Sequence, residues 1–319
     1  MQALVLGQDG PRLADVPRPL PTAGEALLRI TCAGICSTDL ELIRGYAGFS
    51  GVLGHEFTAV VEAAADDVSW VGRRVVGTIN LGCRRCGECL AFGPEHCPSR
   101  TVLGIIGKDG IFAEYATLPI ANLLAIPDGL SDERAVFTEP LAAALRLFDQ
   151  LPLPPSGRVA VVGPGRLGSL IAQVLALSGA RPTVFGRRAE SLALASRWGL
   201  ETGLLAAAPS DDFDLVVEAT GNDGGLAESL RLVRPKGTLV LKSTFHGKAK
   251  VDLTKLVVGE VRLVGSRCGP FAPALRLLER GAIDVASLVE GEYPLARALE
   301  ALEHAGRPGV RKILLRPGV

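Results

Sequence analysis

Four cysteines, Cys83, Cys86, Cys89 and Cys97, lie within fifteen residues of one another. Their spacing predicts a closed tetrahedral zinc site, because four thiolates fill the coordination shell and leave no position open for substrate. An iron–sulfur run begins in a similar way, but its fourth cysteine would stand where this chain has Gly93. Disulfide pairing or chance spacing would also account for four clustered cysteines. We expect a structural zinc.

A second set of metal-binding residue types is spread more widely along the chain. Cys36 is followed nineteen positions later by His55, with Glu56 beside it. Sulfur, nitrogen and oxygen ligands that leave one position vacant form the ligand set of catalytic zinc. A single cysteine or a lone histidine in an apolar stretch is also common in protein cores. The residues by themselves therefore leave both interpretations open.

A glycine-rich segment, Gly163-Pro164-Gly165-Arg166-Leu167-Gly168, follows the expected strand 159–162 directly and begins a helix. In this setting Gly163 permits a tight turn, Gly165 lets the backbone approach a pyrophosphate, and Gly168 lets helix and strand pack closely. The helix start offers unpaired N–H groups and a partial positive charge to the phosphates. A plain glycine turn is the alternative, but the strand–turn–helix context favours a dinucleotide site.

The strand after this helix ends without a carboxylate. It runs into Gly186-Arg187-Arg188, where an acidic residue would bind the 2′-hydroxyl of NAD. Two guanidinium groups suit a 2′-phosphate instead, because arginine makes bidentate bonds to phosphate. We therefore expect NADP to be preferred over NAD, the alternative being that both arginines are the solvated start of a helix. Thr220 and Gly221, at the end of a later strand, are expected to be further cofactor contacts.

Two domains are needed to position these groups, because 319 residues exceed one ordinary core. Residues 1–150 are rich in short strands, and a Pro-rich stretch at 151–157 marks a boundary. Strands then alternate with helices to about residue 284, which predicts an α/β domain with a doubly wound parallel sheet, the Rossmann arrangement. Residues 285–319 return to the earlier character and are expected to complete the first domain.

Composition disfavours several other classes of protein. The 34 Lys and Arg residues balance 34 Asp and Glu residues, so nucleic-acid binding has little support. No apolar run approaches the roughly 18 residues of a membrane helix. The N-terminus also lacks the charged leader and apolar stretch of a secretory signal. We expect a cytoplasmic protein that acts on a small molecule.

Seven motifs along the chain resemble, in order, those of the zinc-dependent alcohol and polyol dehydrogenases of the medium-chain dehydrogenase/reductase family. They are residues 33–39, Gly54-His55-Glu56, the four-Cys loop, residues 109–115, residues 138–141, the glycine turn, and residues 218–221. The resemblance extends from about residue 3 to residue 315. It implies a GroES-like catalytic domain beside the Rossmann domain, a structural and a catalytic zinc in each subunit, NAD(P), and a homo-oligomer (dimer or tetramer).

The resemblance also implies roles for individual residues. Cys36 and His55 would ligate the catalytic zinc, with Glu139 as the third ligand. A glutamate at that position resembles the polyol, sugar and threonine dehydrogenase branch. Glu56 would either bind zinc directly or exchange with water.

Two further residues are implied as partners of the reaction and of the metal ligands. Thr38 would hydrogen-bond the reacting alcohol, and Asp39 would orient the ring of His55. Glu41 stands where many family members have a histidine that relays the proton, so the route of the proton is open.

The activity expected from the resemblance is hydride transfer between a secondary alcohol, such as a polyol or sugar, and NAD(P). Zinc makes a bound hydroxyl more acidic, which favours departure of the hydride. A zinc-independent reductase of activated double bonds is one alternative, although such relatives lack this ligand set. A non-enzymatic zinc-binding module is another, and it would leave Cys36, His55 and Glu139 unexplained.

Overall fold

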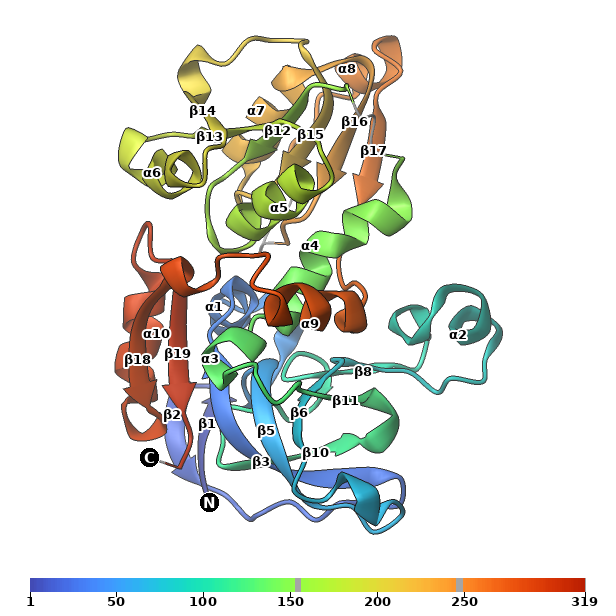
Figure 1. Cartoon of the computed structure of the whole chain (residues 1–319), viewed down its shortest axis with the longest axis vertical. Coiled ribbons are helices and arrows are strands. Elements are labelled where there is room, and N and C mark those ends of the chain that lie inside the picture. The colour runs from blue at the N-terminus through green and yellow to red at the C-terminus, as the bar shows by residue number, and fades with distance from the viewer. Residues whose placement is uncertain (153–155, 245–248, 319) are drawn as a thin grey trace. The chain divides into compact units, whose positions relative to one another are not determined.

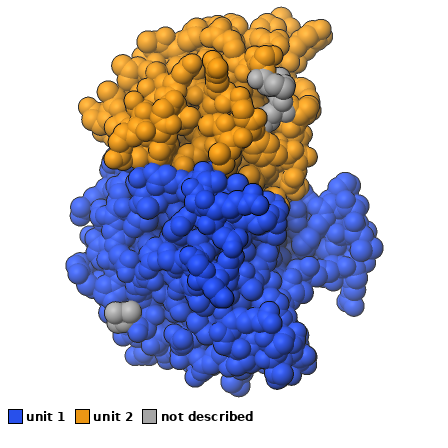
Figure 2. Space-filling model, in the orientation of Figure 1, with its two compact units in different colours: residues 1–139, 271–319 blue, residues 140–270 orange. Residues whose placement is uncertain are grey.

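The computed structural model describes residues 1–152, 156–244 and 249–318, so residues 153–155 of the expected Pro-rich boundary lie outside the described residues. The chain divides into two compact units. Unit 1 comprises Met1–Glu139 and Phe271–Val319, and unit 2 comprises Pro140–Pro270 (Figure 2). Among the described helices, none is long and apolar enough to cross a membrane.

Unit 1 is built on three sheets of short strands (Figure 1). Their order is β11-β6-β5-β3-β19-β18 with β10 beside β3, then β2-β1-β4, then β7-β8-β9. The strands are β1 (Gln2–Gly7), β2 (Gly10–Asp15), β3 (Glu25–Gly34), β4 (Gly51–Val52), β5 (Glu56–Ala63), β6 (Arg74–Gly77), β7 (Asn80–Leu81), β8 (Thr101–Leu103), β9 (Gly107–Lys108), β10 (Tyr115–Pro119), β11 (Leu123–Ala125), β18 (Val289–Pro294) and β19 (Lys312–Arg316). The helices are α1 (Ser37–Ile43), α2 (Gly87–Phe92), α3 (Asp132–Ala135), α9 (Phe271–Glu279) and α10 (Ala298–Gly306).

The last strand of the chain lies inside the main sheet of unit 1. β19 pairs antiparallel with β3, with Leu314 opposite Gly34 and Leu315 opposite Ala33. Leu314 and Leu315 are fully buried, and β19 is paired on both edges, with β3 and with β18. The Arg316 side chain adds ion pairs to Glu292 and Glu133. The C-terminal segment is therefore part of the core of unit 1.

Unit 2 contains one sheet of six parallel strands in the order β14-β13-β12-β15-β16-β17. The strands are β12 (Val159–Val162), β13 (Pro182–Gly186), β14 (Glu201–Leu204), β15 (Phe213–Glu218), β16 (Val233–Leu241) and β17 (Arg262–Gly265), and the helices are α4 (Thr138–Gln150), α5 (Arg166–Leu177), α6 (Ala189–Arg197), α7 (Asp223–Leu232) and α8 (Leu253–Val258). Every residue of β12 is buried, as expected for a central parallel strand. The strand order reverses between β12 and β15, which is the switch point where such sheets bind ligands. This is the predicted α/β Rossmann arrangement.

The unit boundaries differ from the expected ones at residues 150 and 284. Unit 2 begins at Pro140, inside α4, because α4 is tied to the sheet of unit 2. The Lys242 ammonium donates to the Ala143 carbonyl at 2.7 Å, and the Gln150 amide donates to the Gly265 carbonyl at 3.1 Å. At the other boundary α9 belongs to unit 1, where the Arg134 side chain donates to the Leu278 carbonyl.

Candidate active site and metal centres

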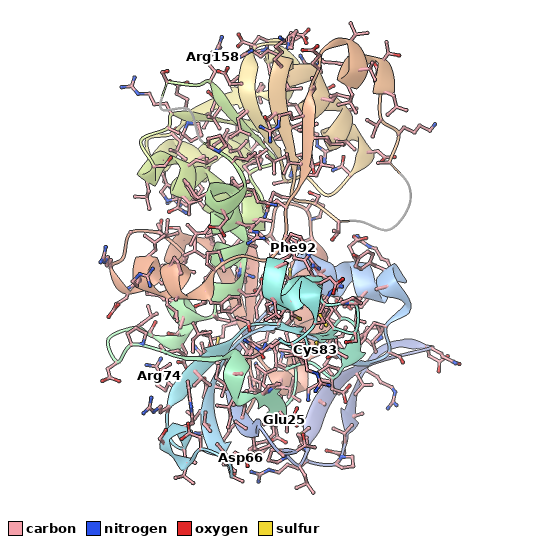
Figure 3. All side chains as sticks on the ribbon, turned by 90° about the vertical axis from the view of Figure 1, so that its right-hand side faces the viewer. Glu25, Asp66, Arg74, Cys83, Phe92 and Arg158 are labelled. Carbon is pink, nitrogen blue, oxygen red and sulfur yellow. The ribbon has the colours of Figure 1, made fainter. Side chains whose placement is uncertain are left out.

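The four-Cys loop lies between β7 and β8 and carries the short helix α2, which stands to one side of the strands of unit 1 (Figure 1). Cys83 and Phe92 are labelled on this loop in Figure 3. The Sγ atoms of Cys83 and Cys89 are 3.9 Å apart, as are those of Cys86 and Cys97. Zn–S bonds of about 2.3 Å place the sulfurs of a tetrahedron about 3.8 Å apart. The four cysteines therefore fit a closed zinc site.

Backbone N–H groups point at the sulfurs of this loop. The Cys83 N–H donates to Cys97 Sγ at 3.4 Å, and the Cys89 N–H donates to Cys86 Sγ at the same distance. The bond from Cys83 lowers the pKa of the Cys97 thiol to about 6. Metal ligation requires thiolates, so these bonds favour the form of the side chain that binds zinc.

The second group consists of Cys36, His55 and Glu56, whose ligand atoms lie within 4.8 Å of one another. Cys36 follows the end of β3 and is the N-cap of α1, while His55 and Glu56 stand at the start of β5. The neighbouring strands β3 and β5 bring them together, since Gly34 pairs with Glu56. His55 is 3% exposed and Glu56 is fully buried, whereas Cys36 is half-buried.

Asp39 connects two members of this group. One of its carboxylate oxygens accepts from the Cys36 backbone N–H at 2.7 Å, and the other lies 3.2 Å from His55 Nδ1. Burial lowers the pKa of the His55 ring, but the Asp39 carboxylate and the Cys36 sulfur raise it, and the pKa lies well above its ordinary value. With Nδ1 turned to Asp39, Nε2 is the nitrogen available to a metal. The Thr38 hydroxyl lies 3.7 Å from Cys36 Sγ.

Glu56 divides its two carboxylate oxygens between protein and site. Oε2 accepts from the buried ammonium of Lys312 on β19, and a Cβ at Gly34 would lie 2.5 Å from this oxygen. Oε1 is buried and has no hydrogen-bond partner among the described residues. A buried carboxylate oxygen beside a thiol and an imidazole fits a divalent metal, because buried polar atoms otherwise need a partner. Lys312 was not predicted as a site residue. A lysine directly before the apolar stretch Ile313–Leu315 could have indicated a buried charge.

Glu139 lies in the first turn of α4 and is half-buried. It is outside the group formed by Cys36, His55 and Glu56. The carboxylate that the structure places beside Cys36 and His55 is thus Glu56, and the role of Glu139 as third ligand stays a prediction.

The glycine turn follows β12 and its three glycines differ in what surrounds them. Gly163 has φ +101°, and a Cβ there would lie 2.8 Å from the Ala219 carbonyl oxygen. A Cβ at Gly168 would overlap the Gly163 carbonyl oxygen. Around Gly165 no atom lies within 4 Å of such a Cβ. The fold explains Gly163 and Gly168, whereas no described neighbour demands a glycine at position 165, which suits a close approach of the backbone to a ligand. Pro164 lies between the first two glycines, and Arg166 and Leu167 begin α5.

Two exposed arginines follow the end of β13. Gly186 ends the strand, and a Cβ there would lie 2.6 Å from Ser191 Oγ. Arg187 and Arg188 are exposed, and Arg188 is the N-cap of α6. Within residues 1–152, 156–244 and 249–318 neither guanidinium forms an ion pair. Both charges are therefore available to an anion.

Thr220 and Gly221 follow β15 and form a tight turn. Thr220 donates from its backbone N–H and its hydroxyl to Glu218 Oε1, both at 2.6 Å. Gly221 has φ +75° and donates to Ser243 Oγ at 2.9 Å. Glu218 and Ser243 were not predicted as site residues.

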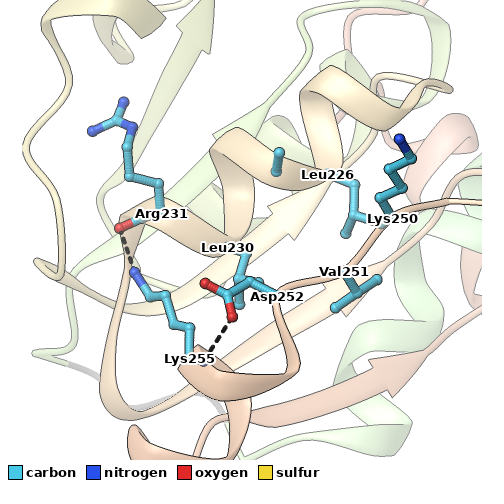
Figure 4. Close-up of a pocket in the computed structure, with 8 residues that line it drawn as sticks. Leu226, Leu230, Arg231, Lys250, Val251, Asp252 and Lys255 are labelled. Carbon is cyan, nitrogen blue, oxygen red and sulfur yellow. Dashed lines mark hydrogen bonds between the residues drawn. The ribbon is translucent and has the colours of Figure 1, made fainter.

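A separate pocket of about 330 Å³ lies between α7 and the start of α8 (Figure 4). It contains none of the predicted site residues. The Lys255 ammonium on its wall donates to the Arg231 carbonyl at 3.0 Å and pairs with Asp211. We assign no role to this pocket.

Comparisons with known proteins agree with this arrangement. Residues 22–128 match the alcohol dehydrogenase GroES-like domain, and residues 167–280 match the zinc-binding dehydrogenase domain. D-arabinitol dehydrogenase 1 of Uromyces fabae is 30% identical over 95% of this chain and 93% of its own length. Galactitol-1-phosphate dehydrogenase from Escherichia coli superposes with a TM-score of 0.90 at 25% identity, over 99% of this chain and all of its own. A protein classed as a zinc-binding dehydrogenase from Sinorhizobium meliloti 1021, bound to NADP, has a TM-score of 0.89 at 28% identity, over 99% of both chains.

The chain belongs to the zinc-dependent medium-chain dehydrogenase family. This confirms the family, the fold class and the oxidoreductase activity predicted from the sequence, with zinc and NAD(P) as the cofactors of the family. A non-enzymatic zinc-binding module is excluded, because both domains of a dehydrogenase are present.

The four-Cys site leads to a first prediction, on zinc content. Cys97→Ser removes one of four sulfur ligands, and we expect zinc per subunit to fall from two to one with a lower melting temperature. Elemental analysis after dialysis measures the metal. Cys268→Ser, outside both groups, is the control and should keep both ions. A C97S protein that retains both would refute the site.

The glycine turn leads to a second prediction. Gly168→Ala forces Cβ against backbone and should lower the free energy of unfolding by about 1–3 kcal/mol. Gly165→Ala meets no atom within 4 Å, so the melting temperature should not change. Its affinity for the dinucleotide should nevertheless fall by about tenfold or more, which corresponds to about 1.4 kcal/mol. Thermal melts and fluorescence titration with NADPH measure the two effects, and unchanged affinity in G165A would argue against backbone contact with the cofactor.

Proposed function

We propose that this enzyme transfers hydride between a secondary alcohol of a polyol, sugar or related compound and NADP, with catalytic zinc at Cys36 and His55. The observation that carries the proposal is the group formed by a half-buried thiol, a buried imidazole and a buried carboxylate, in which one Glu56 oxygen has no hydrogen-bond partner among the described residues. Relatives named D-arabinitol dehydrogenase 1, L-galactonate-5-dehydrogenase and sorbitol dehydrogenase support the substrate class.

The side chains around the group have distinct tasks in this proposal. Zinc bound there would act as a Lewis acid on the substrate hydroxyl, and the nicotinamide would carry the hydride. Asp39 holds Cys36 through the backbone and His55 through its ring, which fixes the two ligands relative to each other. The Thr38 hydroxyl, 3.7 Å from Cys36 Sγ, would accept a hydrogen bond from the substrate hydroxyl and, as it takes that proton, release its own toward solvent.

The two glutamates have different tasks. Glu139 would complete the ligand set, as the family resemblance implies. Glu56 has one oxygen held by Lys312 and one without a hydrogen-bond partner among the described residues, so it would exchange with water as an occasional ligand. Lys312 would hold the Glu56 carboxylate in place.

The preference for NADP is proposed from Arg187 and Arg188, which are exposed at the end of β13. A 2′-phosphate would receive charge-assisted bonds from both guanidiniums. The solved relatives include one bound to NADP and one complexed with NADH, so the relatives do not decide between the two cofactors. The proposed preference for NADP therefore depends on Arg187 and Arg188.

We further propose that the enzyme is a cytoplasmic homo-oligomer, a dimer or a tetramer. On α8 the side chains of Leu253, Val257 and Val258 are 67%, 75% and 79% exposed, and β17 is an edge strand of the sheet. Exposed apolar groups beside an open strand edge favour association. A four-thiolate zinc site suits a reducing compartment. Sedimentation equilibrium would show a monomer if the oligomer is wrong.

A third prediction concerns the catalytic ligands. Cys36→Ala and Glu139→Gln should each leave one zinc and full NADPH affinity. Turnover should fall by at least about a hundredfold, because changes to mere outer partners of metal ligands already cost about 10–100-fold. Glu56→Gln should keep both ions, yet lower the melting temperature, since Lys312 loses its buried partner.

The assay for these variants is a panel of polyols, sugars and secondary alcohols with both nicotinamide cofactors, together with elemental analysis. Wild-type turnover of C36A would end the assignment. Loss of one ion in E56Q and its retention in E139Q would make Glu56 the third ligand instead.

A fourth prediction concerns cofactor choice. Replacing Arg187 and Arg188 together by Ala should weaken NADPH binding by about a hundredfold or more, because two charge-assisted bonds together contribute at least about 3 kcal/mol. NADH affinity should stay the same. Arg197→Ala, an exposed cation at the end of the same helix, is the control. If the wild-type protein binds NADH as tightly as NADPH in fluorescence titration, the preference is wrong.

A further inference from the structure

Glu218 is a buried carboxylate at the end of β15, with 2% of its surface exposed. Its Oε1 accepts three hydrogen bonds: from the Thr220 N–H and the Thr220 hydroxyl, each at 2.6 Å, and from the Ser243 hydroxyl at 3.2 Å. Ser243 Oγ in turn accepts from the Gly221 N–H at 2.9 Å. One oxygen atom thus holds the turn after β15 and the first residues after β16.

The sheet itself does not need a charge at this position. β15 is paired on both edges, and the four residues Phe213, Leu215, Val216 and Val217 supply its apolar core. Among the described residues Glu218 forms no ion pair, so three neutral donors must compensate for the loss of water around the charge. A carboxylate kept under these conditions points to a local task in the turn that it organises.

That turn lies at the switch point of the sheet, against the glycine turn. β15 is the neighbour of β12, and a Cβ at Gly163 would lie 2.8 Å from the Ala219 carbonyl oxygen and 3.0 Å from Thr220 Cγ2. Thr220 is also closed in from another side, because a Cβ at Gly225 would overlap its hydroxyl oxygen. Thr220 is therefore fixed from two sides by residues without side chains and from a third by Glu218.

The position of the turn after β15 on the sheet indicates which half of the cofactor lies next to it. The pyrophosphate binds at the start of α5, and the ribose phosphate is assigned to the β13 side by Arg187 and Arg188. The other half of the dinucleotide must extend across the switch point, over the ends of β15 and β16. Those ends carry Thr220, Gly221 and Ser243.

We propose that Glu218 is a positioning residue for the nicotinamide half of the cofactor. It acts through Thr220, Gly221 and Ser243, which it holds in one arrangement, and does not itself touch the adenosine half. This inference rests on the proposed dinucleotide site at the glycine turn.

The experiment compares the whole dinucleotide with a fragment that lacks nicotinamide. Calorimetric titration of Glu218→Ala with NADPH should show at least about tenfold weaker binding, because Thr220 and Ser243 lose the oxygen that accepts their hydrogen bonds. Binding of 2′,5′-ADP should stay within about twofold, because the adenosine half does not use this turn. Glu218→Gln keeps an acceptor oxygen and should restore NADPH affinity to within about threefold of the wild type.

Two further variants separate positioning from general damage. Asp214→Ala removes a carboxylate at the opposite end of β15, where Asp214 accepts from the Arg158 N–H at 2.7 Å and pairs with Arg234. It should lower the melting temperature and leave both affinities unchanged. Ser243→Ala, which tests the same network if E218A does not fold, should weaken NADPH but not 2′,5′-ADP.

The outcomes are distinct. Equal weakening of NADPH and the fragment, or no change in either, overturns the role of Glu218. A failure of E218Q to restore binding does the same, since an acceptor alone should suffice. Wild-type protein that binds neither compound, and neither NADH nor ADP, would instead refute the dinucleotide site on which the inference rests.

Discussion

The buried ion pair between Glu56 and Lys312 ties the two ends of unit 1 together across 256 residues of sequence. Lys312 opens β19, the last strand, and Glu56 directly follows His55 at the start of β5. Loss of one partner from such a pair typically costs about 3–5 kcal/mol, because the other charge stays buried without compensation. The Glu56 carboxylate beside His55 is therefore compensated only because the C-terminal strand returns to the first domain and brings Lys312 to it.

The same pair accounts for the electrostatic balance of the metal-binding group. A Cys36 thiolate, Asp39 and Glu56 would place three negative charges in a buried region, and Lys312 supplies one positive charge. The two negative charges that Lys312 does not compensate suit a divalent cation, since buried charges require compensation. Asp39 holds Cys36 and His55, and Lys312 holds Glu56, so contacts within the protein set the orientation of these side chains.

Sequence alone predicts most where the chemistry is local. The four cysteines and the glycine turn depend on spacing within one loop, and the structure keeps that spacing compact. Lys312 could not be assigned, because its partner is distant in sequence and pairing of β19 with β3 is a tertiary choice. The start of unit 2 inside α4 was also hidden, since an amphipathic helix has the same pattern in whichever unit it packs. The choice between Glu56 and Glu139 as ligand depends on where the fold places each backbone relative to Cys36 and His55. The spacing of these residues in the sequence does not determine that position.

Along the carboxyl edge of the sheet in unit 2 the charges change sign in strand order. Arg187 and Arg188 follow β13, the positive end of α5 follows β12, and the Glu218 carboxylate ends β15. A dinucleotide has the opposite order, with phosphates toward one end and, when oxidised, a positive ring at the other. Attraction at the arginines and at α5 would orient the molecule, and reversal would bring phosphate toward Glu218. Gly165 has no side chain, so the backbone at this position can come close to the pyrophosphate. The shorter this distance is, the more strongly the charges along the edge of the sheet act on the dinucleotide.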